Sequence, residues 1–338
     1  VAPSRGLGDV YKRQQGRTSG NRRRRKRLPY CQNEAFMRIV EQSYDKEIVL
    51  ALGLFDSVHR GHVHLISEAK KLADDMGIEL AVFTFRNNPF SYYGRDTKMV
   101  FTFEERTRIF EELGVDVVIG KTMDYEYART SREDFIVSIA MNFKVKAVVC
   151  GADYTFGYKG SGDVDFLKYY LKTRGIPLKI VPYLCTDNGD KISSNLIRKY
   201  LSEGRMRLAN QLMGRPYMIS GDVVHCFGRG REFGFPTANL FLPDEKAVIR
   251  EGVYATTVEV DGYIYNSVTN IGSKPTFNDY SLTIESFLVD YKGNLYDKYI
   301  TVYFYSKIRD IKKFNSEWEV RDQIGKDLEV AKMTNRNL

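Results

Sequence analysis

Histidine can donate hydrogen bonds to phosphate oxygens, and it is concentrated in one short segment of this chain. Three of the four histidines lie within residues 53–64, where His59 and His62 stand three positions apart with Gly61 between them. At a helix entrance this spacing lets both rings face one anionic pocket. Gly53 and Gly61 let the backbone approach a ligand closely. The segment therefore predicts a nucleotide-phosphate site.

The flanking sequence predicts how this segment is positioned. An apolar run at 48–52 precedes it, and a helical pattern at about 62–76 follows it. A strand, a tight loop and a helix in this order present free backbone N–H groups and the positive end of the helix dipole to an anion. Two alternatives remain open: the histidines only cap the helix, or a zinc ion is held by His59, His62 and His64.

The alternation of strand and helix patterns continues over the first half of the chain. Short apolar runs lie at 48–52, 80–85, 115–119, 146–150 and 178–183, and helical patterns lie at about 62–76, 102–113, 131–142 and 163–174. This alternation predicts a parallel sheet covered by helices on both faces. Ligands bind such sheets at the carboxyl ends of the strands, so we expect the functional side chains there.

Polar segments follow the predicted strands. Residues 84–89 and residues 151–160 each come directly after an apolar run. Further along, Ser193 and Ser194 open a helical pattern, and Arg198 stands one turn later. Serine hydroxyls and backbone N–H groups at a helix start bind phosphate, and arginine adds a planar, bidentate charge. The alternative is that both serines are ordinary N-caps.

After residue 213 the pattern changes to strands. Runs rich in Val, Ile, Thr and Tyr lie at 218–224, 253–260, 263–269, 282–290 and 299–305. Asp261-Gly262, between two of these runs, is a hairpin signal. Short strands joined by turns predict an antiparallel β-barrel, with a last helix at about 316–332 on its outside. We place a domain boundary near residue 213.

A glycine-rich segment at 228–239 carries a hydroxyl and an amide two positions apart, Thr237 and Asn239. No strand–helix unit surrounds it, so it is neither a P-loop nor a dinucleotide-binding fingerprint. From its pattern alone the segment could be a wide hairpin. Glu285, in a later strand pattern, could by the same standard be a solvated strand residue.

The segment Gly-x-Phe-Asp-x-x-His-x-Gly-His at 53–62 resembles the signature of nucleotidyltransferases that use a His-x-Gly-His loop. More closely, the first half is similar to the FMN adenylyltransferase half of bacterial bifunctional riboflavin kinase/FAD synthetases. The resemblance implies a Rossmann-like nucleotidyltransferase domain over 37–213, with His59, His62 and Arg198 in catalysis. It implies nucleotide or phosphate contacts from Gly53, Phe55, Asp56, Gly61, Ser193, Ser194 and Lys159, and flavin contacts from Asn88 and Asp153.

The segment Gly-Phe-Pro-Thr-Ala-Asn at 234–239 resembles the riboflavin kinase motif. This resemblance implies a kinase domain over 214–338, in which Thr237 and Asn239 hold Mg²⁺ and nucleotide phosphate and Glu285 accepts the proton of the ribityl hydroxyl. It adds nucleotide contacts from Gly228, Gly230 and Gly234. The chain would then phosphorylate riboflavin to FMN and adenylylate FMN to FAD, using two ATP and Mg²⁺ or another divalent cation and releasing pyrophosphate.

The chain departs from that family pattern at four positions. The family usually has Gly at Ser57, His at Asn88, Arg at Lys159 and Thr at Asn195. Lys159 keeps the charge of arginine without its planar fork. We expect adenylyl transfer to survive these changes. The alternative is a monofunctional riboflavin kinase whose first domain is weakened or inactive.

Residues 1–36 carry the net charge of the chain. They contain ten Lys and Arg residues against two acidic ones, which accounts for the whole net charge of +8. The segment is polar, shows no apolar periodicity and precedes Met37-Arg38, so we expect a disordered tail that is not native sequence. A nucleic-acid-binding or targeting arm is the alternative. The remainder is neutral, so we expect no nucleic-acid partner.

The four cysteines are scattered singly, which suits a reducing cytosol, so we expect a cytoplasmic protein. No apolar run approaches the roughly 20 residues that span a bilayer, and we expect no membrane partner. The expected partners are the small molecules riboflavin, FMN and ATP. The sequence leaves the oligomeric state open.

Overall fold

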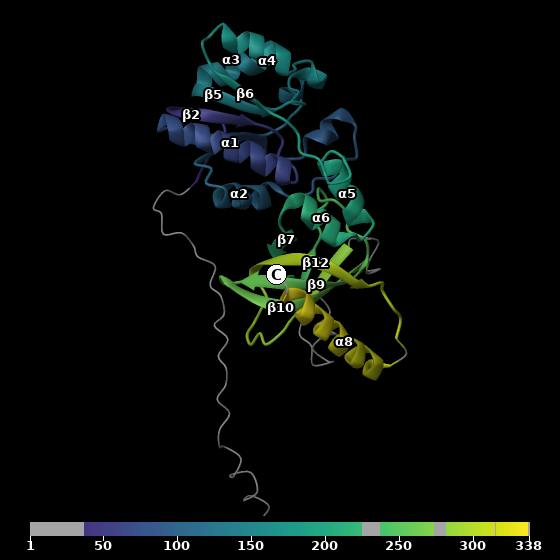
Figure 1. The fold of residues 1–338 in the computed structure, drawn as a ribbon. Coiled ribbons are helices and arrows are strands. Elements are labelled where there is room, and N and C mark those ends of the chain that lie inside the picture. Colours follow the sequence, from purple (N-terminus) through teal and green to yellow (C-terminus); the bar gives the residue numbers. More distant parts are fainter. Residues whose placement is uncertain (1–36, 225–236, 274–281, 315, 337–338) are drawn as a thin grey trace, which may run out of the picture.

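A computed structural model of the chain describes residues 37–224, 237–273, 282–314 and 316–336. Two six-stranded sheets organise it, one in each half of the chain. Figure 1 shows the sheets at the two ends of an elongated molecule, with α5 (Ser194–Ser202) and α6 (Met206–Met213) between them. The predicted tail at 1–36 and the predicted contacts from Gly228, Gly230 and Gly234 lie outside the described residues.

The N-terminal sheet is parallel, with strand order β1-β4-β3-β2-β5-β6, as the sequence predicts. Its strands are β1 (Arg38–Val40), β2 (Tyr44–Leu52), β3 (Glu79–Phe85), β4 (Val117–Lys121), β5 (Phe143–Gly151) and β6 (Leu178–Val181). Because the strands are parallel, the loops that follow β2, β3 and β5 converge at one edge of the sheet.

Helices cover both faces of this sheet (Figure 1): α1 (Arg60–Met76) and α2 (Phe103–Glu112) lie on one face, α3 (Arg132–Asn142) and α4 (Val164–Lys172) on the other. The side chains of β2 alternate between them. Val49 and Ala51 join the apolar cluster of α1, whereas Ile48 and Leu50 join that of α3 and α4. Because successive strand side chains point to opposite faces, a strand buried on both faces is apolar throughout.

Local sequence signals set the ends of these helices. Thr102 and Glu105 form a capping box at the start of α2, and Gly77 ends α1 in the left-handed conformation. The loops at the carboxyl edge contain three short 3₁₀ turns, η1 (Pro89–Tyr93), η2 (Tyr127–Arg129) and η3 (Tyr158–Gly160). In the described part of the chain, every helix is too short or too polar to cross a bilayer.

The C-terminal sheet is antiparallel, with order β7-β12-β9-β10-β11-β8. Its strands are β7 (Tyr217–Asp222), β8 (Thr237–Phe241), β9 (Gly252–Val260), β10 (Tyr263–Ser273), β11 (Leu282–Leu288) and β12 (Tyr299–Arg309). Asp261 and Gly262 form the predicted hairpin turn, both with positive φ.

This second sheet is a half-barrel. The N–H of Val224 donates to the carbonyl of Asn239 at 2.9 Å, so the β7 and β8 edges approach each other. Among the described residues, however, β7 and β8 are not joined by a ladder. The last helix, α8 (Glu317–Arg336), packs on the outside, where Ala331 meets Val253 and Ala255 of β9.

The two halves share one apolar core and a buried ion pair. The cluster on the α1 side of the first sheet continues through α6 into the half-barrel. Between the halves, the backbone of Met99 bonds to Glu245 and Ala247, at 2.6 Å each. Lys246 forms a buried ion pair with Glu105 of α2. The segment before α2 is therefore fixed between the two sheets.

Candidate active sites

His59 and His62 open α1 as a stacked pair. His59 is the N-cap of the helix, and its Nδ1 accepts the backbone N–H of His62 at 3.2 Å. The ring centroids lie 3.7 Å apart. A Cβ on Gly61 would lie 3.1 Å from Cε1 of His59, so glycine leaves room for the stacked ring. The same arrangement therefore caps α1 and stacks the two imidazole rings.

Both imidazoles are neutral at pH 7 in this structure. Burial lowers the pKa of His59 to about 4. Burial also lowers the pKa of His62 well below its ordinary value, and the nearby His59, Arg106 and Lys191 act in the same direction. The buried Nδ1 of His62 has no hydrogen-bond partner among the described residues. Because a neutral imidazole keeps one N–H donor, the pair can bind an anion without being charged.

The loop between β2 and α1 is strained. Phe55 and Val58 have φ values of 51° and 38°, and both side chains are buried. Positive φ is unfavourable for residues with a Cβ, above all for a β-branched valine. Such residues cluster at functional sites and persist where the surrounding structure holds them. A Cβ on Gly53 would lie 2.8 Å from the Phe55 ring, so this loop requires glycine there.

The start of α5 lies against the histidine loop, the segment 53–62 that carries His59 and His62. Ser193 caps α5 by accepting the N–H of Leu196 at 3.3 Å, the role that the N-cap alternative assigns to it. Ser194 Oγ lies 2.9 Å from Ser57 Oγ. Ser57 therefore contacts Ser194 directly, and the N-terminus of α5 lies beside the loop that leads into α1.

Arg198 and Asp56 form an ion pair behind this loop. Nη1 of Arg198 also donates to the carbonyl of Lys98 at 3.2 Å, and Nη2 donates to Oδ1 of Asn195 at 2.6 Å. The other oxygen of Asp56 accepts the N–H of Val100 at 2.7 Å. The structure thus places Asp56, predicted to bind nucleotide, where it orients Arg198. Neither side chain lines the neighbouring cavity.

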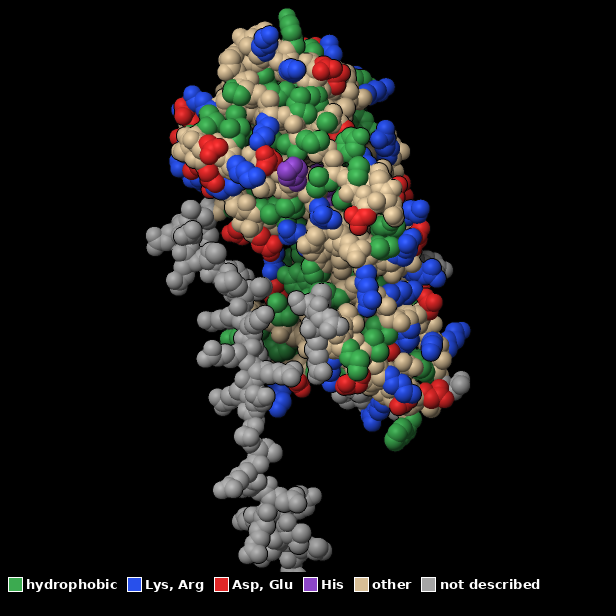
Figure 2. Space-filling view, viewed as in Figure 1, with side chains coloured by type: hydrophobic (Ala, Val, Ile, Leu, Met, Phe, Trp, Pro, Cys, Tyr) green, Lys and Arg blue, Asp and Glu red, His purple; other side chains and the backbone are tan. Residues whose placement is uncertain are grey.

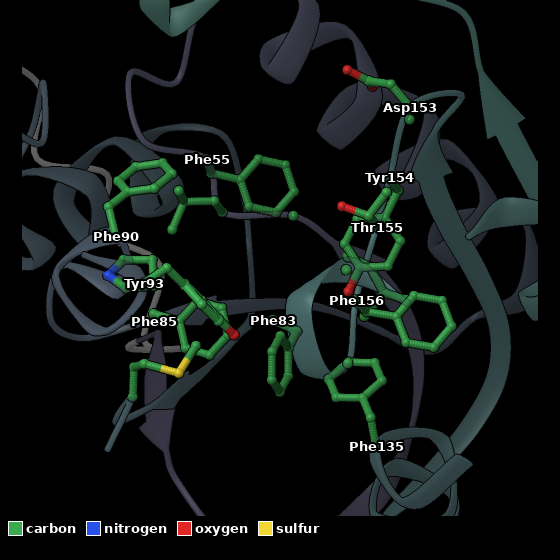
Figure 3. Close-up of a pocket in the computed structure, with 18 of the residues that line it drawn as sticks. Phe55, Phe83, Phe85, Phe90, Tyr93, Phe135, Asp153, Tyr154, Thr155 and Phe156 are labelled. Carbon is green, nitrogen blue, oxygen red and sulfur yellow. The ribbon is translucent and has the colours of Figure 1, made fainter. Parts of the chain in front are cut away.

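A cavity of about 810 Å³ opens beside the histidine loop, and both Phe55 and His62 line it. Aromatic side chains form two of its walls (Figure 3). One wall carries Phe85, Phe90 and Tyr93, and the other carries Tyr154 and Phe156. Apolar walls of this kind suit a flat aromatic ligand, with polar groups at one end to fix its orientation.

Asp153, Lys159 and Lys191 supply charge at this cavity. Asp153 and Lys159, two of the predicted binding residues, line it. Lys191 pairs with Asp153 at 2.5 Å. Burial alone would raise the pKa of Asp153, but the hydrogen bond and charge of Lys191 hold it below its ordinary value. The sequence prediction missed Lys191, although its place two residues before Ser193 was an available signal.

Asn88, predicted to contact flavin, caps η1. Its Oδ1 accepts the N–H of Phe90 at 3.0 Å, and its Nδ2 donates to the carbonyl of Thr97 at 2.8 Å. Asn88 itself does not line the cavity. Its contacts shape the loop that brings Phe90 and Tyr93 to the aromatic wall.

Thr237, Asn239 and Glu285 meet on neighbouring strands of the half-barrel. β8 pairs with β11 so that Asn239 lies directly opposite Glu285. Thr237 Oγ1 donates to Glu285 Oε1 at 2.9 Å. Oδ1 of Asn239 is buried and has no partner among the described residues. Three oxygen-bearing side chains therefore share one small area.

The two sites differ in what they could bind. No group of three or more His, Cys, Asp or Glu side chains in the described ranges is placed to hold a metal ion. The hydroxyl, amide and carboxylate oxygens of Thr237, Asn239 and Glu285 are the hard ligands that Mg²⁺ prefers, usually together with waters and substrate phosphates. The unpartnered amide oxygen of Asn239 fits such an ion.

Comparison with known proteins gives two family matches, one in each half of the chain. Residues 41–196 match the family model for FAD synthetase, and residues 213–334 match that for riboflavin kinase. A Bacillus subtilis protein named bifunctional riboflavin kinase/FMN adenylyltransferase is 38% identical, over 84% of this chain and 91% of its own length. A Haemophilus influenzae protein of the same name is 35% identical, over 84% of this chain and 92% of its own length.

A solved structure has the same overall fold. It is a Streptococcus pneumoniae protein described as a macrolide-efflux protein, with a TM-score of 0.78 and 30% identity over 88% of this chain and 98% of that one. The description belongs to that protein, and the similarity concerns the fold.

The sheets, the histidine loop and the half-barrel oxygens define a chain in which a nucleotidyltransferase half is joined to a flavokinase half. The chain belongs to the family of bifunctional riboflavin kinase/FMN adenylyltransferases. One chain carries both matches, so the bifunctional prediction is confirmed against the monofunctional alternative.

Proposed function

We propose that the histidine-loop site transfers the adenylyl group of ATP to FMN and that the half-barrel site phosphorylates riboflavin. The observation that supports this most strongly is the convergence of the histidine pair, the start of α5 and the aromatic cavity at one edge of the parallel sheet. Such edges bind nucleotides, and helix N-termini favour anionic groups.

Adenylyl transfer at this site requires positioning and charge stabilisation, without a covalent enzyme intermediate. A phosphate oxygen of FMN attacks the α-phosphorus of ATP in line. The new O–P bond forms while the bond to the β-phosphate oxygen breaks, and pyrophosphate leaves. His59 and His62 donate hydrogen bonds to phosphate oxygens, and Arg198, oriented by Asp56, opposes the negative charge.

The aromatic cavity holds the flavin ring in this proposal. Phe85, Phe90 and Tyr154 offer faces and edges to it, and the neighbouring histidines bring the phosphates to the cavity end. Lys159 lines the same cavity, and Lys191 pairs with Asp153, which also lines it. Both lysines therefore favour anionic ligands there.

At the half-barrel site, Glu285 accepts the proton of the terminal ribityl hydroxyl while that oxygen attacks the γ-phosphorus of ATP and ADP leaves. The hydrogen bond from Thr237 orients the Glu285 carboxylate. Mg²⁺ would be held by the side-chain oxygens of Thr237 and Asn239, where it would neutralise phosphate charge.

Incubating the full chain with riboflavin, ATP and Mg²⁺, and resolving the flavins by chromatography, tests both assignments. We expect FMN to appear first and FAD to follow. FMN without FAD would leave only the kinase assignment standing. If neither FMN nor FAD forms, the result contradicts the proposal.

We also propose a boundary near residue 213 between two domains, 37–213 and 214–338, and a cytoplasmic location. In the part of the chain that the structure describes, Cys150 and Cys185 are free thiols, as is usual in a reducing compartment. Figure 2 shows basic and acidic side chains interspersed over the visible face of the molecule. This face therefore offers no argument for a nucleic-acid partner, and the proposed partners are small molecules.

A further inference from the structure

Arg106 of α2 is a buried, charged side chain that is not one of the proposed catalytic groups. It is 1% exposed, and among the described residues it forms no ion pair. Burial lowers its pKa to about 10 against the opposing effect of nearby Asp56, so the guanidinium remains charged at neutral pH. Burying a charge without an ion-pair partner is costly, so hydrogen bonds must compensate this guanidinium.

The hydrogen bonds of Arg106 join two segments that line the cavity. Nη1 donates to the carbonyl of Leu54 at 3.0 Å and to Thr84 Oγ1 at 2.6 Å. Nη2 donates to the carbonyl of Phe85, at the end of β3, at 2.6 Å. Thr84 Oγ1 donates in turn to the same Leu54 carbonyl at 2.7 Å. The loop after β2 and the end of β3 are therefore tied together through one guanidinium.

The Leu54 carbonyl stands directly before the strained residue Phe55. On the other side of Phe55, the carboxylate of Asp56 is fixed by Val100 and Arg198. The Phe55 ring packs edge-on against the His62 ring, with centroids 5.3 Å apart. Strained backbone persists only when its surroundings hold it, so the contacts on both sides of Phe55 determine where the ring lies against His62.

We propose that Arg106 is a positioning residue for adenylyl transfer. It holds the Leu54 carbonyl and thereby the strained turn at Phe55, and this turn sets the position of the His62 ring at the cavity. The inference rests on the proposed function of the histidine-loop site. Arg106 itself does not line the cavity, so it acts through Leu54 and Phe55.

The test measures both reactions of the full chain in variants of Arg106. In Arg106→Met we expect kcat for FMN adenylylation to fall about 100-fold, because small displacements of catalytic groups have effects of that size. The KM for ATP should change far less. Riboflavin phosphorylation in the same sample should stay within about twofold, because Thr237, Asn239 and Glu285 belong to the other sheet. Arg106→Lys keeps the charge and should restore part of the rate.

Arg108→Met is the matched control on the same helix. Its guanidinium pairs with Glu259 of the half-barrel at 2.6 Å. This variant should retain adenylyl transfer. If Arg106→Met and Arg108→Met lose adenylyl transfer equally, or if Arg106→Met loses both reactions by the same factor, the role of Arg106 is structural and the inference fails.

Thr84→Val keeps the inference testable if Arg106→Met does not fold. It removes the hydroxyl shared by Arg106 and Leu54, and we expect an intermediate loss of about tenfold in adenylyl transfer alone. An unchanged rate would overturn the inference. Should the wild-type chain form no FAD, the proposed function fails as well. Wild-type FAD formation with an unaffected Thr84→Val or Arg106→Met contradicts this inference alone.

Discussion

The histidine-loop site and the half-barrel site are built in opposite ways. The first collects its groups from residues 53–62, 84–100, 151–160 and 191–198, which meet because a parallel sheet brings distant strand ends together. The second takes Thr237, Asn239 and Glu285 from two adjacent antiparallel strands. The first site therefore depends on contacts between remote segments, whereas the second depends on the register of one ladder.

The surroundings of the two sites show the same difference. Behind the histidine loop, Asp56 and Arg106 hold backbone groups that belong to other segments. At the half-barrel, Thr237 and Glu285 contact each other directly across one strand pair. We expect mutations far from the ligand to affect the first site more than the second.

The largest expected effect is at the half-barrel. Glu285→Gln removes the proposed base and should lower riboflavin phosphorylation by about 10³- to 10⁴-fold, the upper range for general-base catalysis. FMN adenylylation, measured with FMN supplied, should be unchanged in the same preparation. An unaffected kinase rate would remove Glu285 from the site.

The corresponding change in the histidine loop is His62→Ala. Loss of a donor to the phosphates should lower FAD formation by about 10²- to 10³-fold and leave FMN formation intact. His64→Ala, two positions along the same helix, is the matched control and should retain both activities. Equal loss of both products in His62→Ala would show that the two sites are not independent.

The ion pair between the halves tests whether their stabilities are separable. Lys246→Met leaves Glu105 buried without its cation, so the free energy of unfolding should fall by about 3 kcal/mol. Denaturation in urea followed by circular dichroism measures this. Lys326→Met removes an exposed pair with Asp322 on α8 and should cost less than about 1 kcal/mol. Equal losses of unfolding free energy in the two variants would mean that the buried pair stabilises the chain no more than an exposed pair does.

The smallest expected effect concerns the pH dependence of the histidine loop. The pKa of His59 is lowered from 6.5 to about 4, so between these values the unfolded chain binds a proton that the folded chain does not. Stability from this group is present above pH 6.5 and is lost as the pH falls toward 4. At pH 5 the loss is about 2 kcal/mol.

His59→Asn removes the titration and keeps a side chain that caps helices well. The decrease in unfolding free energy between pH 7.5 and pH 5.0 should therefore be about 2 kcal/mol smaller in this variant than in the wild type. An identical decrease in both proteins would show that the His59 ring is not buried in its neutral form.

Periodicity and turn chemistry were sufficient to predict the two sheets, because the apolar runs and the Asp261-Gly262 hairpin are local signals. Two short strands were missed. β1 has only three residues and pairs with β4 from the start of the described chain. β8 begins within the glycine-rich motif, whose composition does not resemble a strand.

The candidate sites were predictable where a motif is contiguous and not where partners are distant. His59 and His62 stand out because they are three residues apart. The part played by Asp56 depends on Val100 and Arg198, which are 44 and 142 residues away in the chain. Arg106 follows a capping box on a charged helix and looks like a solvated residue until its surroundings are known.

The two backbone hydrogen bonds between Met99 and the 245–247 segment bear on how this enzyme could be taken apart. A cut near residue 213 divides the chain between the two sheets. It also exposes to solvent Lys246 and the apolar residues of the core that the two halves share. Fragments made there should be poorly soluble on their own. A chimaera that exchanges flavokinase halves between relatives would need residues 98–112 from the same parent as its barrel.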